Sequence, residues 1–226
     1  MQPILDLFLH LDEFLSKAVD NYGTWIYALF FVIVFAETGL VILPFLPGDS
    51  LLFAAGALSA SKPDHLNVWL VSGGLLVAAS LGDAVNYAVG AYFGDDFLQG
   101  KRIKFVKQAH LDRTKIFFER YGGKAIVIAR FVPIVRTIAP FFAGLGAMSY
   151  RRFVIYNIVG ALLWVGVCVG AGYAFGNLPF VKKNFSVVIM GIVFISVLPL
   201  AIEWIMHRRA KAKSSSLRQI GTKPPS

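Results

Sequence analysis

The sequence predicts an all-α, polytopic membrane protein in which two inverted re-entrant helical hairpins accompany transmembrane helices. Three observations support this fold class. Hydrophobic residues make up 57% of the 226 residues and charged residues only 15%, whereas soluble domains carry about 45–50% and about 25%. The hydrophobic residues form runs near the roughly 20 residues that a spanning helix needs. Prolines and charges interrupt two of these runs. This composition excludes a disordered chain and argues against a soluble enzyme.

The first half of the chain contains three predicted elements. Residues 1–20 place apolar side chains at helical spacing with acidic residues between them, which predicts an amphipathic helix on the membrane surface. Residues 25–60 are too long and too broken for one span, and we interpret them as the first re-entrant hairpin. Its breaks are Pro44, Pro47 and Gly48. Residues 66–94 form an apolar run long enough for a transmembrane helix.

The second half repeats this order. Residues 95–124 form a basic cytoplasmic segment, and residues 125–150 form a second re-entrant hairpin broken at Pro133 and Pro140. Two further transmembrane helices are predicted at residues 153–176 and 185–206, and a basic cytoplasmic tail at residues 207–226. The whole chain is predicted to be one membrane domain.

The distribution of basic residues orients these elements. Lysine and arginine gather in cytoplasmic segments of membrane proteins, and eight of them lie in residues 95–124 and six in the tail from residue 207. The C-terminus is therefore predicted to be cytoplasmic. The hairpin at 125–150 begins and ends on the cytoplasmic side, and the hairpin at 25–60 begins and ends on the outer side. Inverted repeats of this kind are an architecture of secondary transporters.

Five ionisable residues lie in or beside the apolar runs: Glu37, Asp49, Asp83, Arg130 and Arg136. Each costs roughly 2.5–3.5 kcal/mol in a bilayer interior, so they must be paired, hydrated or neutralised. Two carboxylates flank the break of the first hairpin, and two guanidinium groups flank Pro133 in the second. Hairpins that enter from opposite faces bring their tips together near the midplane. We therefore expect these four side chains to converge.

Two interpretations of the four converging charges remain. They are either salt bridges that hold the hairpins together or an anion site. Buried ion pairs stabilise proteins poorly compared with apolar packing, and the arginine fork matches a phosphate group. In the second interpretation Arg130 and Arg136 bind the phosphate, while Glu37 and Asp49 carry a proton. Asp83 shares a helix face with Tyr87, and these two form either a hydrogen-bonded packing pair or a proton relay.

Other site chemistry is absent from the sequence. The single cysteine, Cys168, excludes an intrachain disulfide and a cysteine-built metal site. The four histidines show no metal-ligand spacing, and no serine-hydrolase, zinc-protease or P-loop motif is present. Most of the basic residues lie in the predicted cytoplasmic segments, which explains the net charge of +9 without nucleic acid. We expect no enzymatic activity, no cofactor, no metal ion and no nucleic-acid partner.

Four segments resemble one known family. These segments are FAETGL at 35–40, PFLPGDSLL at 44–52, the run from Gly82-Asp83 to Gly94, and ARFVPIVRT at 129–137. They are similar to the DedA family of bacterial inner-membrane proteins, which belongs to the DedA/SNARE-associated superfamily, and the resemblance extends from about residue 5 to about residue 210. It implies the paired re-entrant hairpins and transport of undecaprenyl phosphate. The essential acidic pair of the family corresponds to Glu37 and Asp49, and its essential arginine pair to Arg130 and Arg136.

The resulting hypothesis is a flippase for a lipid phosphate, most simply one that recycles undecaprenyl phosphate. It is expected to sit in the inner membrane, to use the proton motive force and to support envelope integrity. Its expected partners are a polyprenyl-phosphate lipid, protons and membrane lipids. The alternatives are a proton-coupled small-ion antiporter, a non-selective phospholipid scramblase, an assembly factor and an intramembrane hydrolase. The sequence leaves the lipid, the coupling ion, the direction of transport and the oligomeric state open.

Overall fold

The computed structural model describes residues 23–39, 48–93 and 118–176, together with single residues at 21, 116, 178, 179, 181, 187, 188 and 191. The fold is all helical, and these described residues contain no strand. Several predicted features lie outside them. These are the surface helix at 1–20, the two prolines of the first hairpin, most of the basic segment, most of the last span and the basic tail (Pro44, Pro47, 94–115, 192–226).

The first half contains three helices: α3 (Trp25–Gly39), α4 (Gly48–Ser61) and α5 (Val68–Tyr92). The side chain of Asn67 caps the start of α5, because its carbonyl oxygen accepts hydrogen bonds from the N–H groups of Trp69 and Leu70. The N–H group of Asn67 donates to the Tyr27 hydroxyl at 2.9 Å, which ties the starts of α3 and α5 together. With 25 residues, α5 is about 37 Å long, longer than the hydrocarbon core of a bilayer.

The second half contains a short 3₁₀ turn η1 (Gly122–Lys124), α8 (Ala125–Ala129), α9 (Pro133–Phe142), a π-helical turn η2 (Ala143–Ala147) and α10 (Tyr150–Phe175). Pro133 begins α9, in the first turn where a helix does not need its N–H group. The prediction of a break at Pro140 is wrong: this residue lies inside α9, which continues to Phe142. A proline inside a helix removes one hydrogen bond, and packing against neighbouring helices compensates for that loss.

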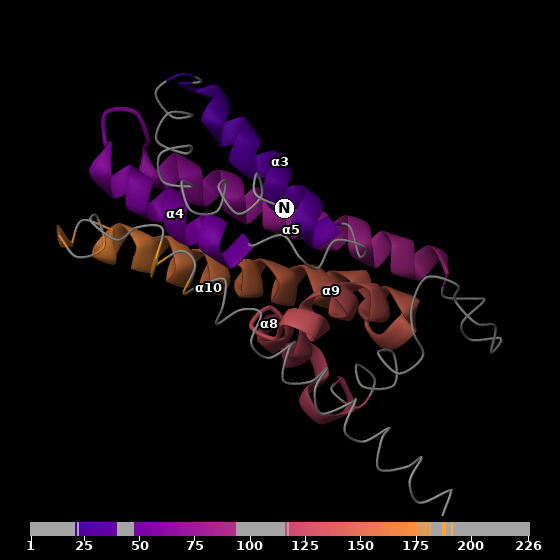
Figure 1. Cartoon of the computed structure of the whole chain (residues 1–226). Coiled ribbons are helices and arrows are strands. Elements are labelled where there is room, and N and C mark those ends of the chain that lie inside the picture. The colour runs from indigo at the N-terminus through magenta and orange to yellow at the C-terminus, as the bar shows by residue number, and fades with distance from the viewer. Residues whose placement is uncertain are drawn as a thin grey trace, which may run out of the picture.

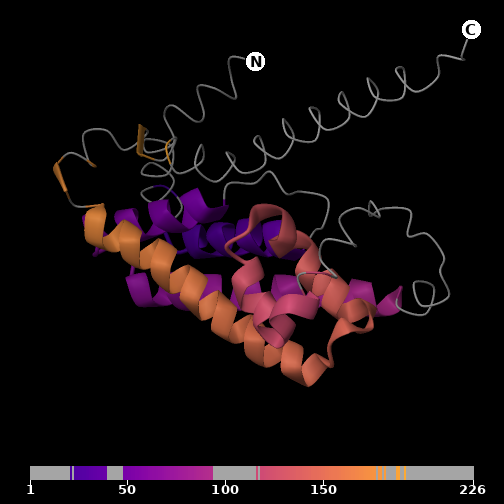
Figure 2. The same ribbon diagram turned by 90° about the horizontal axis from the view of Figure 1, so that it is seen from below.

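The two arms of the first hairpin pack on different long helices. Figure 1 shows α3 beside α5 and α4 beside α10, and Figure 2 shows α10 crossing the molecule on one side. Along α3, Tyr27 lies near the start of α5 and Gly39 near its middle, so α3 runs parallel to α5. On the other arm, Asp49 lies beside Trp164 of α10 and Ala57 beside Gly176, so α4 runs parallel to α10. The long helices themselves are antiparallel, because Asn157 of α10 bonds to Ser80 of α5 and Phe153 stacks on Tyr87. These arms therefore run in opposite directions, and the first hairpin begins and ends at the same end of the molecule.

The second hairpin repeats this pattern with the long helices exchanged. Its first arm, α8, packs on α10, and its second arm, α9, packs on α5. A Cβ atom on Gly160 of α10 would lie 3.3 Å from the Cα of Val127, and one on Gly90 of α5 would lie 2.0 Å from the carbonyl oxygen of Phe141. In each half, the first arm thus packs on the long helix of its own half and the second arm on that of the other half. The two halves therefore repeat the same arrangement of a hairpin and a long helix, with their second arms exchanged.

The outer surface of the long helices is apolar. Two described helices, α5 and α10, are long and apolar enough to cross a membrane. Trp69 and Tyr92 are 82% and 83% exposed at opposite ends of α5, as expected of aromatic residues at the two membrane interfaces. Between the ends, aliphatic side chains are exposed along both helices: Val77, Leu81, Val85, Ile155, Ile158, Val159, Leu162, Leu163 and Val167. Exposing these apolar side chains to water would cost free energy, whereas contact with lipid would not.

Gly172 allows α4 and α10 to approach closely, and its replacement by alanine should destabilise the protein. An added Cβ would lie 2.0 Å from the backbone oxygen of Phe53, and overpacking of this kind costs about 1–3 kcal/mol. Thermal unfolding in detergent should therefore occur at a lower temperature. Gly166→Ala in the same helix is the control, since nothing lies within 4 Å of its added Cβ. Equal unfolding temperatures for the two variants would contradict this close packing.

Candidate functional site

Arg136 joins both arms of the first hairpin. It lies in the first turns of α9, where its Nη1 donates to Asp49 Oδ1 at 3.0 Å and its Nη2 donates to Glu37 Oε1. Glu37 lies near the end of α3 and Asp49 in the first turn of α4. The Glu37 side chain is 2% exposed and that of Arg136 17%. One guanidinium group from the second hairpin therefore binds both carboxylates at the tip of the first.

Arg130 forms a second ion pair with a different carboxylate. It follows the last residue of α8, and its Nη2 lies 2.6 Å from Asp83 Oδ2 of α5. The same nitrogen donates to Asn157 Oδ1 of α10, while Asn157 Nδ2 donates to the carbonyl oxygen of Ser80 at 2.9 Å. The Arg130 and Asp83 side chains are 6% and 7% exposed. This network links α8 to both long helices.

Trp164 of α10 connects the two ion pairs. Its indole Nε1 donates to Asp49 Oδ1 at 2.7 Å. The centre of its ring lies 5.5 Å from Cζ of Arg136 and 5.8 Å from Cζ of Arg130, within the range of cation–π attraction. The side chain is 3% exposed. Trp164 therefore touches both guanidinium groups and also holds the carboxylate that Arg136 binds.

The site encloses almost no free space. A cavity of about 20 Å³ lies among its side chains, which are Glu37, Thr38, Asp83, Arg130, Arg136, Thr137 and Trp164. That volume holds about one water molecule. Glu37 Oε2 is buried and has no hydrogen-bond partner among the described residues. A phosphate group is larger than a water molecule, so in this arrangement it can reach the arginines only if the carboxylates move away.

Close approach of the backbone is also needed here. A Cβ on Gly48, the first residue of α4, would lie 1.7 Å from Glu37 Oε2. Any other residue at this position would displace the Glu37 carboxylate. The glycine that the sequence marks as a hairpin break is therefore also the residue that lets α4 begin directly beside Glu37.

The charges of the site do not balance. Three carboxyl groups face two guanidinium groups: Asp83 lies near the middle of α5, and the other four side chains lie at the tips of the hairpins. With every group ionised, the site carries one net negative charge. Uncompensated charge in an apolar interior is costly. One bound proton would make the cluster neutral.

Glu37, Asp49, Arg130 and Arg136 lie together, as the sequence predicts. The partners of Asp83 and Tyr87 differ from the prediction. Asp83 binds Arg130 instead of Tyr87, and the Tyr87 hydroxyl donates to the carbonyl oxygen of Met148 at 2.8 Å. The Tyr87 ring stacks on Phe153, with 4.6 Å between ring centres. Although these two residues share one face of α5, Asp83 reaches Arg130 at the end of α8, whereas Tyr87 reaches Met148 and Phe153 around the start of α10.

Sequence reasoning missed Asn157 and Trp164. A tryptophan inside an apolar run resembles a side chain that faces lipid or core, and a single asparagine in a span resembles a packing residue. Their spacing carried a usable signal, because residues seven apart lie on the same face of a helix. With Gly160 between them, they define the face of α10 that meets the two arginines.

Comparisons with known proteins agree on one family. Residues 46–174 match the family described as the VTT domain. The chain is 50% identical to Protein DedA of Escherichia coli over 212 residues, which are 94% of this chain and 97% of that protein. It is 35% identical to the inner membrane protein YghB of Salmonella typhimurium over 190 residues, which are 84% of each chain. It is also 42% identical to an uncharacterized membrane protein of Mycobacterium leprae over 186 residues, which are 82% of each chain.

The comparison with solved structures found no match. The family assignment therefore rests on the sequence matches, and the helices and buried residues described above agree with a membrane protein. The matched region includes α4, α5 and the whole second hairpin, with four of the five charged site residues. The fifth, Glu37, lies within the region shared with the Escherichia coli protein, which covers nearly the whole chain. This chain belongs to the DedA family of membrane proteins, the family of the VTT domain.

Proposed function

We propose that this protein transports a lipid phosphate, most simply undecaprenyl phosphate, across the bacterial inner membrane with the proton motive force as its energy source. The observation that carries the proposal is the pairing of Arg136 with two carboxylates from both arms of the opposite hairpin. A guanidinium group holds a carboxylate and a phosphate with the same forked geometry. The carboxylates therefore occupy the positions that phosphate oxygens would take.

Binding would proceed by exchange of anions. As a lipid phosphate arrives, Asp49 and Glu37 leave Arg136. The phosphate oxygens then accept hydrogen bonds from the N–H groups that the carboxylates have left. The small cavity supports this order, since a phosphate group needs the carboxylates to move before it fits. Trp164 stays beside both guanidinium groups and would keep them in place during the exchange. The prenyl chain would remain in the bilayer and leave the site between the hairpins.

The charge balance supports proton coupling. A phosphate monoester carries about −1.5 to −2 charges at neutral pH. Adding it to a cluster that already has one excess carboxylate would leave about 2.5 to 3 uncompensated negative charges in an apolar interior. Protonation of Glu37 and Asp49 reduces that excess to about 0.5 to 1 negative charge and releases both carboxyl groups from Arg136. Each proton moves from water to a carboxylate oxygen on binding and returns to water when the lipid leaves.

Membrane placement follows from the same elements. In this proposal α5 and α10 cross the bilayer, and the hairpins α3–α4 and α8–α9 enter it from opposite faces without crossing. The parallel and antiparallel packing of the arms, the exposed aromatic residues at both ends of α5 and the predicted cytoplasmic basic segments support it. The protein is then a multi-pass inner-membrane protein with a cytoplasmic C-terminus.

Reconstitution in vesicles tests the proposal. The purified protein is placed in vesicles that contain undecaprenyl phosphate, and the fraction of lipid on each face is followed with and without an imposed pH gradient. We expect movement that the gradient accelerates and that Arg130→Ala abolishes. Movement no faster than in empty vesicles would refute the proposal. Equally fast movement of ordinary phospholipids, in both directions and without a gradient, would instead identify a scramblase.

One observation favours a second candidate, a proton-coupled small-ion antiporter. The cavity of about 20 Å³ has the size of a water molecule or a small ion, and Glu37 Oε2 presents a buried acceptor without a partner to it. In that case the carboxylates bind the ion and the arginines only hold them. Ion flux through vesicles that lack polyprenyl phosphate would favour the antiporter over the lipid transporter.

A further inference from the structure

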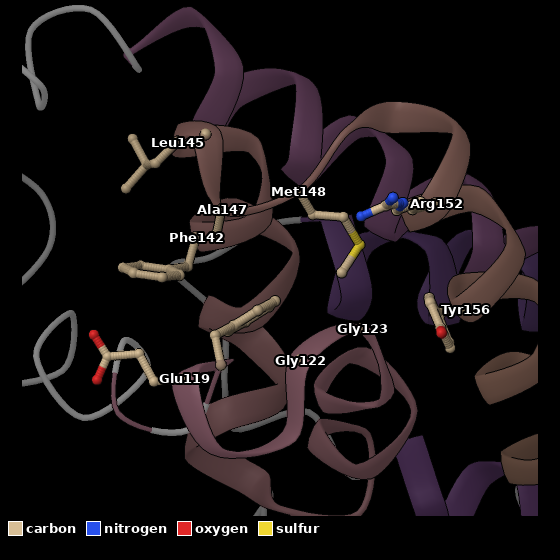
Figure 3. Close-up of a pocket in the computed structure, with 11 residues that line it drawn as sticks. Glu119, Gly122, Gly123, Phe142, Leu145, Ala147, Met148, Arg152 and Tyr156 are labelled. Atoms are coloured by element: carbon tan, nitrogen blue, oxygen red, sulfur yellow. The ribbon is translucent and has the colours of Figure 1, made fainter.

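A second, larger cavity lies where the hairpin α8–α9 begins and ends. Its volume is about 610 Å³, within the range of small-molecule sites. The cavity lies between η1, η2 and the start of α10 (Figure 3), and its lining residues are Phe118, Glu119, Gly122, Gly123, Phe142, Leu145, Gly146, Ala147, Met148, Arg152 and Tyr156. None of these residues belongs to the charged site described above.

The lining of this cavity is amphipathic. Phe142, Leu145 and Met148 provide apolar walls, whereas Arg152 and Glu119 are the only charged residues among the described residues that line it. Figure 3 shows these two on opposite sides of the cavity. The charged residues around the cavity are mostly basic. Among the described residues, 118–124 and 148–156 contain Arg120, Lys124, Arg151 and Arg152, and the only acidic residue in these two ranges is Glu119. A ligand with one anionic end and an apolar body matches this surface.

We infer that this cavity is the docking site of the lipid phosphate on the cytoplasmic face, with Arg152 binding the phosphate and the apolar walls binding the first part of the hydrocarbon chain. The inference rests on the proposed function, and it adds a residue and a place of binding to it. The occupant is a lipid and not free phosphate, because a single arginine contributes only about tenfold to affinity and most of the lining is apolar. Contact between the apolar walls and the hydrocarbon chain provides the rest of the binding affinity.

Consecutive residues of α10 reach this cavity and the central site. Tyr156 lines it and packs against Gly123, where an added Cβ would lie 2.3 Å from the ring. The next residue, Asn157, accepts a hydrogen bond from Arg130. A lipid held by Arg152 is therefore placed to pass its phosphate to Arg130 when the arms of the second hairpin separate.

Two adjacent arginines provide a matched test. Arg152 lines the cavity and Arg151 does not, while both are exposed and carry the same charge at the same membrane face. A photoactivatable polyprenyl phosphate is crosslinked to the protein in vesicles, and the crosslinked peptide is identified. We expect Arg152→Gln to reduce labelling of residues 142–156 about tenfold, corresponding to the loss of one charge-assisted hydrogen bond. The Arg151→Gln variant should be labelled to the same extent as the wild type.

Transport kinetics separate docking from the central step. Arg152→Gln should raise the lipid concentration at half-maximal rate about tenfold and leave the maximal rate near that of the wild type. If Arg151→Gln changed labelling and kinetics as much as Arg152→Gln, the effect would be one of general charge, and the inference would be overturned. Labelling found only outside residues 142–156 would overturn it too. Inhibition of labelling by inorganic phosphate alone would also overturn the choice of a lipid. If the wild-type protein is labelled in the cavity but moves no lipid, the docking site stands and the proposed transport fails.

Discussion

Replacing Arg136 by lysine is expected to reduce lipid transport about 100-fold or more while leaving the protein folded and inserted. Lysine keeps the positive charge, so the carboxylates of Glu37 and Asp49 retain a cation. The ammonium group is a point charge and cannot reproduce the two parallel N–H···O bonds of the guanidinium group. Loss of two charge-assisted hydrogen bonds, each worth about 1.5–3 kcal/mol, corresponds to this change in rate. The measurement is the initial rate of undecaprenyl phosphate movement per inserted molecule.

The control for this variant is Arg151→Lys, which makes the same exchange at an exposed position outside both cavities. Its rate should equal that of the wild type. Thermal unfolding of Arg136→Lys should also be compared, because the new ammonium group still neutralises the two carboxylates. If Arg136→Lys transports lipid at the wild-type rate, the forked binding of phosphate is excluded, and Arg136 is then only a counter-ion for the carboxylates of the antiporter alternative.

The long helices were well predicted because their signal is local. The predicted span at 66–94 corresponds to α5 at 68–92, and the one at 153–176 corresponds to α10 at 150–175. The three extra residues at the start of α10 include Arg151 and Arg152, which end the apolar run but not the helix. Long basic side chains extend to the polar interface, so charge marks the edge of the membrane and not the end of the helix.

The pairing of charges was harder to predict because it is not local. The partners of Arg136 lie 99 and 87 residues away, and that of Arg130 lies 47 residues away. The sequence indicates that two carboxylates and two arginines meet, but not that Arg136 takes both carboxylates and leaves Arg130 to Asp83. That division follows from the exchange of arms between halves: α8 delivers Arg130 between the long helices, and α9 delivers Arg136 to the tip of the first hairpin.

The surroundings of Pro140 and Trp164 were also hard to predict, because they too depend on packing between distant segments. A proline in an apolar run has the same local signal whether it ends a helix or lies within one, and the packing of α9 on α5 decides between the two. Trp69 and Trp164 both lie in apolar spans, yet one is 82% exposed and the other 3%. Burial depends on which face of α10 meets α4 and α8, which is a property of the assembled fold.

The Arg130–Asp83 pair separates a structural role from a functional one. Asp83→Asn leaves Arg130 buried without its counter-ion, and removal of one partner of a buried pair costs about 3–5 kcal/mol. Arg130→Gln should destabilise the protein similarly. The double variant Asp83→Asn/Arg130→Gln contains no buried charge at this position, and its two introduced amides can hydrogen-bond to each other and to Asn157. We therefore expect the double variant to recover most of the lost stability, measured by thermal unfolding in detergent.

Transport by the double variant then decides what the ion pair is for. If Arg130 binds phosphate, the recovered protein should still move lipid at least 100-fold more slowly than the wild type, because no guanidinium group replaces the lost one. Stability and activity would thus respond differently to the same pair of substitutions. If transport returned together with stability, the ion pair would only hold α8 against α5 and α10, and phosphate binding would rest on Arg136 alone. A buried pair that is replaceable for folding but indispensable for transport is what a substrate site predicts, since neutral residues can satisfy the packing but do not supply the forked positive charge that binds the phosphate.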